Sequence, residues 1–281
     1  MARQSSKELV REYIASGQST PIPQLLPLEL RVMVSAACHA RGLTTGTARF
    51  PTGATLPYHV HDCGEAITIV EGQAEVAVEG RRYSLRQLDC IHVPEGVAHA
   101  ITNASQRPFL AHTAFSSVNP SRAFIAGSFP DEACGFAAAL PGRPEHVMRF
   151  GQADMYVLSE GTRFYDLFAS RFGSVGICGG YGEFEPGASL PCHVHKFDES
   201  ITIVGGQALC QVQGKEYCLS GCDTAFVPEA RPHRFLNRSD EVMAMIWVYA
   251  GSEPERTLVP AEYCSGQLAW PGIDGLEERG L

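Results

Sequence analysis

The chain has 281 residues, a formal net charge of −9, 44% hydrophobic residues and 19% charged residues. That length allows one large hydrophobic core or two ordinary ones, and the composition argues against a disordered chain. Its lysines and arginines form no run, which disfavours nucleic-acid binding, and no apolar stretch approaches the roughly 18 residues of a membrane span.

The N-terminal segment predicts one short helix. Residues 6–16 read SKELVREYIAS, with Ser6 as a cap and Gly17 as a stop. The first residues lack the apolar core of a signal peptide, so we expect a cytoplasmic protein whose ten cysteines stay reduced. None of them forms a CxxC pair, and we expect small buried hydrophobic side chains.

An internal repeat organises the remaining chain. Residues 57–72 read PYHVHDCGEAITIVEG, and residues 191–206 read PCHVHKFDESITIVGG. The offset of 134 positions (191 − 57) also places VPEGVAHAITN on VPEARPHRFLN without insertion. A repeat of this length, present twice, indicates two domains in tandem. Because a Pro/Gly-rich stretch separates the copies, we assign the domains to residues 1–145 and 146–281.

Each half has the pattern of short β-strands. Segments such as AITIV, CIHVP, SITIV and TAFVP are rich in Val, Ile and Thr and are bounded by Gly, Pro and Asp. Strands of about four to six residues at this spacing are typical of an all-β sandwich or barrel. We therefore predict an all-β protein of two barrels with a few short helices.

Two histidine–glutamate clusters occupy equivalent positions in the two halves. His59 and His61 share one face of a strand, with Cα atoms about 6.6–6.8 Å apart, so both rings can reach one ion. Glu65 has the same parity, and His99 follows a turn that can return it to the site. The second half repeats the set as His193, His195, Glu199 and His233. This duplication favours metal ligands over ordinary core histidines.

The spacings resemble the two sequence motifs of the cupin superfamily. The matching residues in the first half are Gly53, His59, His61, Glu65, Gly72, Pro94, Gly96, His99 and Asn103. Leu88 stands where the second motif begins with glycine, and in the second half Cys222 and Ala230 replace two glycines. The resemblance implies two cupin (jelly-roll) barrels, each with one metal held by three histidines and one glutamate.

This ligand set bears on the metal. Four protein ligands nearly saturate tetrahedral zinc, but they leave two open positions on an octahedral ion. We therefore expect up to two divalent metals per chain, with Fe(II) favoured and Mn(II), Ni(II), Co(II) or Zn(II) as alternatives. Similarity to quercetin-dioxygenase-like cupins implies that Glu65 or Glu199 also accepts a proton, the alternative being that both are ligands only.

The predicted activity is that of an Fe(II)-type dioxygenase acting on a small oxygenated organic metabolite. The same ligands would serve a non-redox isomerase, decarboxylase or hydrolase, and a non-catalytic binding bicupin is a further alternative. The fold by itself does not separate these functions. A homodimer is the commonest assembly for such a protein.

The residues around the ligands differ between the halves. Tyr58 precedes the first His-x-His pair and Cys192 the second, while Cys63 corresponds to Phe197. For Cys63 we favour a thiol filling a turn over a redox-sensitive one. The residues expected to line the two cups by parity are Ile67, Ile69, Ile201 and Ile203. We predict unlike pockets around like ligands, with one catalytic and one structural centre.

Overall fold

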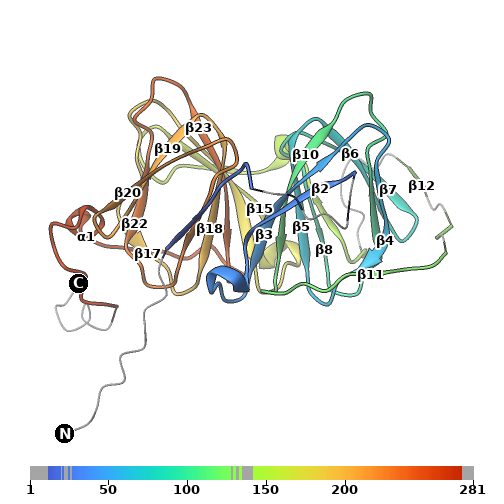
Figure 1. Ribbon diagram of the computed structural model, residues 1–281, viewed down its shortest axis with the longest axis horizontal. Coiled ribbons are helices and arrows are strands. Elements are labelled where there is room, and N and C mark those ends of the chain that lie inside the picture. The colour runs from blue at the N-terminus through green and yellow to red at the C-terminus, as the bar shows by residue number, and fades with distance from the viewer. Residues whose placement is uncertain are drawn as a thin grey trace, which may run out of the picture.

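The computed structural model describes residues 12–19, 21, 25, 27–127, 129–130, 133–134 and 142–273. Two β-barrels lie side by side along the long axis of the molecule (Figure 1). Each barrel combines two sheets in which almost every strand pair is antiparallel. The predicted all-β architecture of two tandem jelly-roll barrels is confirmed.

The first barrel is made of two six-stranded sheets. One has the order β13 (His146–Met148), β8 (Cys90–Val93), β5 (Glu65–Glu71), β10 (Phe109–Phe115), β3 (Thr44–Phe50) and β2 (Glu29–Val34). The other has the order β11 (Ala123–Phe124), β4 (Thr55–Val60), β9 (His99–Thr102), β6 (Gln73–Val78), β7 (Arg81–Arg86) and β12 (Ala133–Cys134).

The second barrel pairs a seven-stranded sheet with a five-stranded one. The larger has the order β1 (Tyr13–Ala15), β21 (Thr224–Val227), β18 (Glu199–Gly205), β23 (Met243–Tyr249), β16 (Cys178–Phe184), β15 (Thr162–Phe168) and β14 (Met155–Tyr156). The smaller has the order β20 (Lys215–Ser220), β19 (Gln207–Val212), β22 (His233–Leu236), β17 (His193–Val194) and β24 (Thr257–Leu258). Short helical turns are η2 (Ala36–Cys38), η3 (Phe150–Gln152), η4 (Ser170–Phe172) and α1 (Ala261–Ser265).

The two barrels share an apolar layer. One face of β5 lines the first barrel, where Ile67 and Ile69 are fully buried, and the other face joins a core cluster with residues of the second barrel. This double burial explains why β5 reads as an almost continuous apolar run. Within the layer, the hydroxyls of Thr45 and Ser200 form a hydrogen bond of 2.7 Å, so the two barrels meet through packed sheets.

The N-terminal segment departs from its prediction. Tyr13–Ala15, expected to end a helix, is strand β1, which pairs with β21 of the second barrel; residues 6–11 lie outside the described residues. The free edge of β21 supplies hydrogen bonds that the local sequence does not reveal, and Tyr and Ile suit a strand. From there the chain enters the first barrel at β2, while β13 pairs with β8. The domain division at 145/146 stays a prediction. Strand β1 comes from the N-terminal part of the chain but pairs within the second barrel, and β13 begins just after the division but pairs within the first.

One pair of cysteines contradicts the expectation that all ten stay reduced. Cys192 and Cys264 form a disulfide, with Cα atoms 5.9 Å apart, a usual separation for such a bond. It ties α1 to the segment that leads into β17. By contrast, burial raises the pKa of Cys63 to about 12, which agrees with a thiol that fills a turn.

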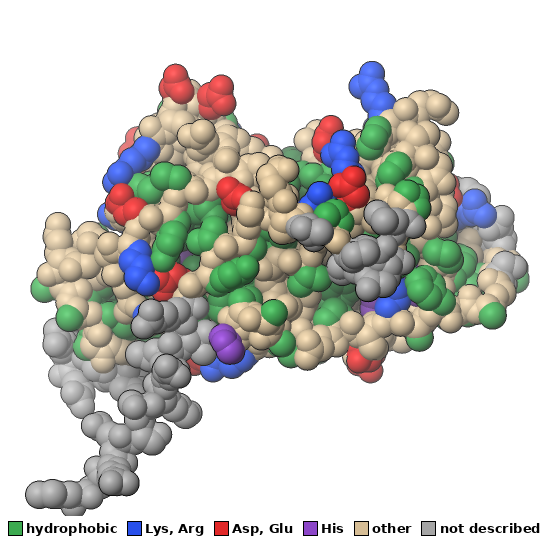
Figure 2. Space-filling view, in the orientation of Figure 1, with side chains coloured by type: hydrophobic (Ala, Val, Ile, Leu, Met, Phe, Trp, Pro, Cys, Tyr) green, Lys and Arg blue, Asp and Glu red, His purple; other side chains and the backbone are tan. Residues whose placement is uncertain are grey.

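The surface agrees with the charge pattern of the sequence. On the face shown in Figure 2, basic side chains are interspersed with acidic ones and with apolar residues. Among the helices of the described part of the chain, none has the length and apolarity needed to cross a membrane.

Two buried histidines on the shared layer should make the fold sensitive to acid. His92 and His112 lie on the same face as Ala66 and Ala114, and burial lowers the pKa of each to about 4. Because the ordinary value is about 6.5, the unfolded chain binds protons between these values that the folded chain does not, and stability falls as the pH drops through this window.

We expect the urea midpoint of unfolding to decrease between about pH 7 and about pH 5. His112→Gln, which has no titrating group at this position, should weaken that decrease. An equal decrease in both proteins would contradict the assignment.

Candidate metal centres and an adjoining cavity

The first cluster consists of His59, His61, Glu65 and His99, brought together by three strands. His59 lies on β4 directly across from His99 on β9, and Glu65 begins β5. All four side chains are buried, and their ligand atoms lie within 4.8 Å of one another. The convergence predicted from the i, i+2 spacing is therefore present in the fold.

The histidines of the first cluster are oriented by the backbone. The Nδ1 atoms of His59 and His99 bond to the carbonyls of Pro57 and Val97 at 2.8 and 3.1 Å, and that of His61 bonds to the carbonyl of Ser121. With Nδ1–H donating, each Nε2 has a free lone pair that faces the cluster. The Nε2 atoms of His59 and His61 are buried without a hydrogen-bond partner among the described residues. One divalent ion fits this donor set.

The electrostatics of the first cluster also suit a metal. Burial lowers the pKa of His59 to about 3, which keeps its imidazole neutral. Burial alone would raise the pKa of Glu65, but the imidazoles of His61 and His99 beside its carboxylate hold it well below its ordinary value. Neutral imidazole and ionised carboxylate are the protonation states that bind metal ions.

The second cluster, His193, His195, Glu199 and His233, repeats this geometry at the offset of 134. Its ligand atoms are equally close and buried. The Nδ1 atoms of the three histidines bond to the carbonyls of Pro191, Glu255 and Arg231 at 2.8, 2.6 and 2.8 Å. Burial would raise the pKa of Glu199, but the nearby imidazoles of His195 and His233 lower it. The structure thus brings all eight predicted ligands into two sites that fit up to two divalent metals.

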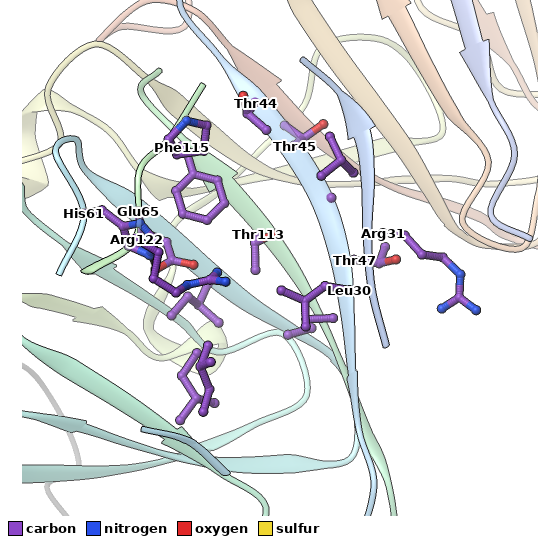
Figure 3. A pocket seen from close by; sticks show the side chains of 18 of the residues that line it. Leu30, Arg31, Thr44, Thr45, Thr47, His61, Glu65, Thr113, Phe115 and Arg122 are labelled. Carbon is purple, nitrogen blue, oxygen red and sulfur yellow. Dashed lines mark ion pairs between the residues drawn. The ribbon is translucent and has the colours of Figure 1, made fainter. Parts of the chain in front are cut away.

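A cavity of about 150 Å³ adjoins the first cluster (Figure 3). His61 and Glu65 form part of its wall, and Ile67 lines it as predicted. Ile69, also predicted to line the cup, does not border this cavity, although both isoleucines belong to the hydrophobic core of the first barrel. The cavity gives the first cluster room for a small organic molecule.

Arg122 is a residue of the site that was not predicted from the sequence. It follows Ser121, whose carbonyl orients His61, and Figure 3 shows its side chain beside His61 and Glu65 in the cavity. Its Nε is buried without a hydrogen-bond partner among the described residues, and burial lowers its pKa against the pull of Glu65. Extending the repeat offset beyond Asn103 would have paired Arg122 with Arg256 and revealed it.

The second cluster has aromatic rings where the first has the cavity. At the offset of 134, Phe164 replaces Leu30 and Trp247 replaces Thr113. A Cβ at Gly180 would lie 2.6 Å from the Trp247 ring, so the glycine provides its space. His195 further contacts the rings of Tyr249 and Phe197, with centroids 4.4 and 5.4 Å away. The predicted difference between the pockets around the two clusters is therefore present. Tyr58 contributes little to this difference, because its hydroxyl accepts a hydrogen bond from the Gly80 amide at 3.1 Å.

Each of the two predicted proton acceptors lies against a ligand histidine of its own cluster. Glu65 Oε2 lies 2.8 Å from His99 Nε2, and Glu199 Oε2 lies 2.7 Å from His233 Nε2. These contacts are compatible with the role of a ligand. A further role in proton transfer stays a prediction.

Both halves of the chain match a known protein family. A family model described as a cupin domain matches residues 46–115 and 180–249. No curated protein matches the chain by sequence. At 15–17% identity, the structural similarities below concern the fold alone.

Three solved structures are similar over most of the chain. The formate complex of Lactobacillus farciminis oxalate decarboxylase has a TM-score of 0.68 at 15% identity, covering 83% of this chain and 84% of that one. A Bacillus subtilis oxalate decarboxylase studied for its Mn(II) centres has 0.67 at 17%, covering 89% and 81%. A variant of the Bacillus subtilis enzyme has 0.71 at 17%, covering 95% and 85%.

Proposed function

Because this chain belongs to the cupin superfamily and carries two cupin domains in tandem, we propose that it is a metal-dependent decarboxylase of a small carboxylic acid. The reaction would take place at the first cluster and would be non-redox: the carboxylate of a 3-oxo acid leaves as carbon dioxide, the electron pair of the broken C–C bond passes to the oxo group of the substrate, and a proton from water then replaces the carboxylate. The second cluster would hold a structural metal. The similar fold of oxalate decarboxylases supports this alternative over the dioxygenase favoured by the sequence.

The observation that carries the proposal is Arg122 beside the first cluster. A guanidinium is a planar fork of donors that matches a carboxylate, and the Nε of Arg122 is buried without a partner among the described residues. His61 and Glu65 border the same cavity. A carboxylate placed there would meet Arg122 and the metal site together.

Each residue at the first cluster would have a distinct role in the reaction. His59, His61, Glu65 and His99 would hold the ion, which when bound acts as a Lewis acid toward a substrate oxygen. Arg122 would orient the carboxylate, and the apolar wall would exclude water, which strengthens these charge interactions. Mn(II) becomes the preferred metal, by analogy with the Bacillus subtilis enzyme.

Arg122→Leu should lower the rate of carbon dioxide release by about 10²-fold or more, a loss comparable to that of one charged contact to the reacting group. Arg256→Leu, at the equivalent position in the second barrel, is the matched control and should keep most of the activity. The measurement is carbon dioxide release from a panel of 3-oxo acids by Mn(II)-loaded protein under argon.

An oxygen electrode separates the two candidate chemistries. The proposal requires turnover without oxygen uptake. Turnover that consumes oxygen, and stops under argon with Fe(II)-loaded protein, would establish the dioxygenase instead, since the same ligand set leaves open positions on Fe(II).

A further inference from the structure

We propose that the substrate carries, next to its carboxylate, an apolar group of about the size of a benzene ring. This inference rests on the proposed function, because it specifies which acid the first cluster would take. The cavity would accept a monocarboxylate that carries an aryl or branched-alkyl group, and it would disfavour a small dicarboxylate.

The wall of the cavity has two chemically different parts. The charged groups His61, Glu65 and Arg122 lie together on one side, and Leu30 lies on the other (Figure 3). The large apolar residues of the lining come from six different strands and are Leu30, Phe50, Leu56, Ile67, Ile101 and Phe115. A ligand that fills such a space has one charged end and one apolar body.

The size of the cavity sets the size of that body. Its volume is about 150 Å³, and an engineered cavity of about this volume lined by Leu, Ile and Phe stays dry and binds benzene. A second carboxylate would meet mostly apolar side chains and the neutral hydroxyls of four threonines, and its desolvation is costly without a cation to balance the charge. Arg31 does not supply one: it points away from the cavity (Figure 3), and its guanidinium bonds to Glu29 and to the carbonyl of Ser19 at 3.1 and 2.7 Å.

The second barrel shows that a ring fits the equivalent space. Thr113 is flanked by Gly46 and Ile67 on the neighbouring strands, and at the offset of 134 Trp247 is flanked by Gly180 and Ile201. The same framework therefore accommodates an indole where the first barrel has a small threonine. The space that the Trp247 side chain fills in the second barrel is thus available to a ligand in the first barrel.

The test is calorimetric binding of acetate, 2-methylpropanoate, 4-methylpentanoate, benzoate and oxalate to full-length protein loaded with Mn(II). Affinity should rise about fourfold per buried methylene, the equivalent of ~0.8 kcal/mol, and benzoate should bind more tightly than acetate or oxalate. Thr113→Trp should reduce benzoate binding to the level of acetate. Val175→Trp adds the same ring at a position that is 75% exposed and should bind benzoate like the unaltered protein.

If Thr113→Trp does not fold, Leu30→Phe narrows the cavity from the opposite wall, as Phe164 does in the second barrel. Equal affinities along the series, or tighter binding of oxalate than of benzoate, would overturn the inference while leaving the proposed function intact. Absence of any carboxylate binding, or unchanged binding by Arg122→Leu, would instead overturn the proposed function, and the inference with it.

Discussion

Replacing His59 and His61 together with alanine should remove one of two equivalents of bound metal and abolish carbon dioxide release. Their Nε2 atoms are buried and have no hydrogen-bond partner among the described residues, and the backbone holds both rings in the binding tautomer. With two of four ligands gone, the remaining donors cannot complete the site. Elemental analysis of the dialysed protein, together with the activity assay, measures both effects.

The matched variant replaces His193 and His195, which occupy the same positions in the second barrel. It should lose the other equivalent of metal and lower the melting temperature, because that ion would stabilise the folded state. Retention of two equivalents by either double variant would refute the ligand assignment. Complete loss of activity in the second variant, with its fold intact, would refute the division into a catalytic and a structural centre.

Glu145→Ala should cost about 3–5 kcal/mol of unfolding free energy, because it leaves the buried Arg81 guanidinium without its bidentate partner. Glu145 accepts bonds of 2.7 and 2.8 Å from Arg81 and one of 2.6 Å from the hydroxyl of Tyr83, and all three residues are buried. This network ties the segment that precedes β13 to β7. Urea unfolding followed by circular dichroism measures the loss.

An exposed ion pair provides the control for this prediction. Glu185 lies 2.9 Å from Arg163, and the two side chains are 43% and 41% exposed; Glu185→Ala should cost less than about 1 kcal/mol because water screens such a pair. Similar losses of unfolding free energy in the two variants would show that burial is not the reason why the Arg81–Glu145 pair stabilises the fold.

The fold and the two ligand sets could be predicted from the sequence because both depend on local spacing. The i, i+2 spacing of His59 on β4 and His61 just beyond its end is a property of the chain itself, and the second copy at the offset of 134 shows that the spacing is no accident. The strands of the repeat likewise follow from short runs of β-branched residues. By contrast, Tyr13–Ala15 became a strand only because β21 offers a free edge.

The sequence by itself therefore determined the two tandem cupin barrels, the two candidate metal sites and the expectation that their surroundings differ. Only the tertiary structure decided what differs and where. Leu30, Thr113 and Arg122 come from distant parts of the chain to form one cavity, and Cys192 reaches a partner 72 positions away. Such contacts depend on how strands cross in three dimensions, and residue spacing carries no record of which side chains will share the same space.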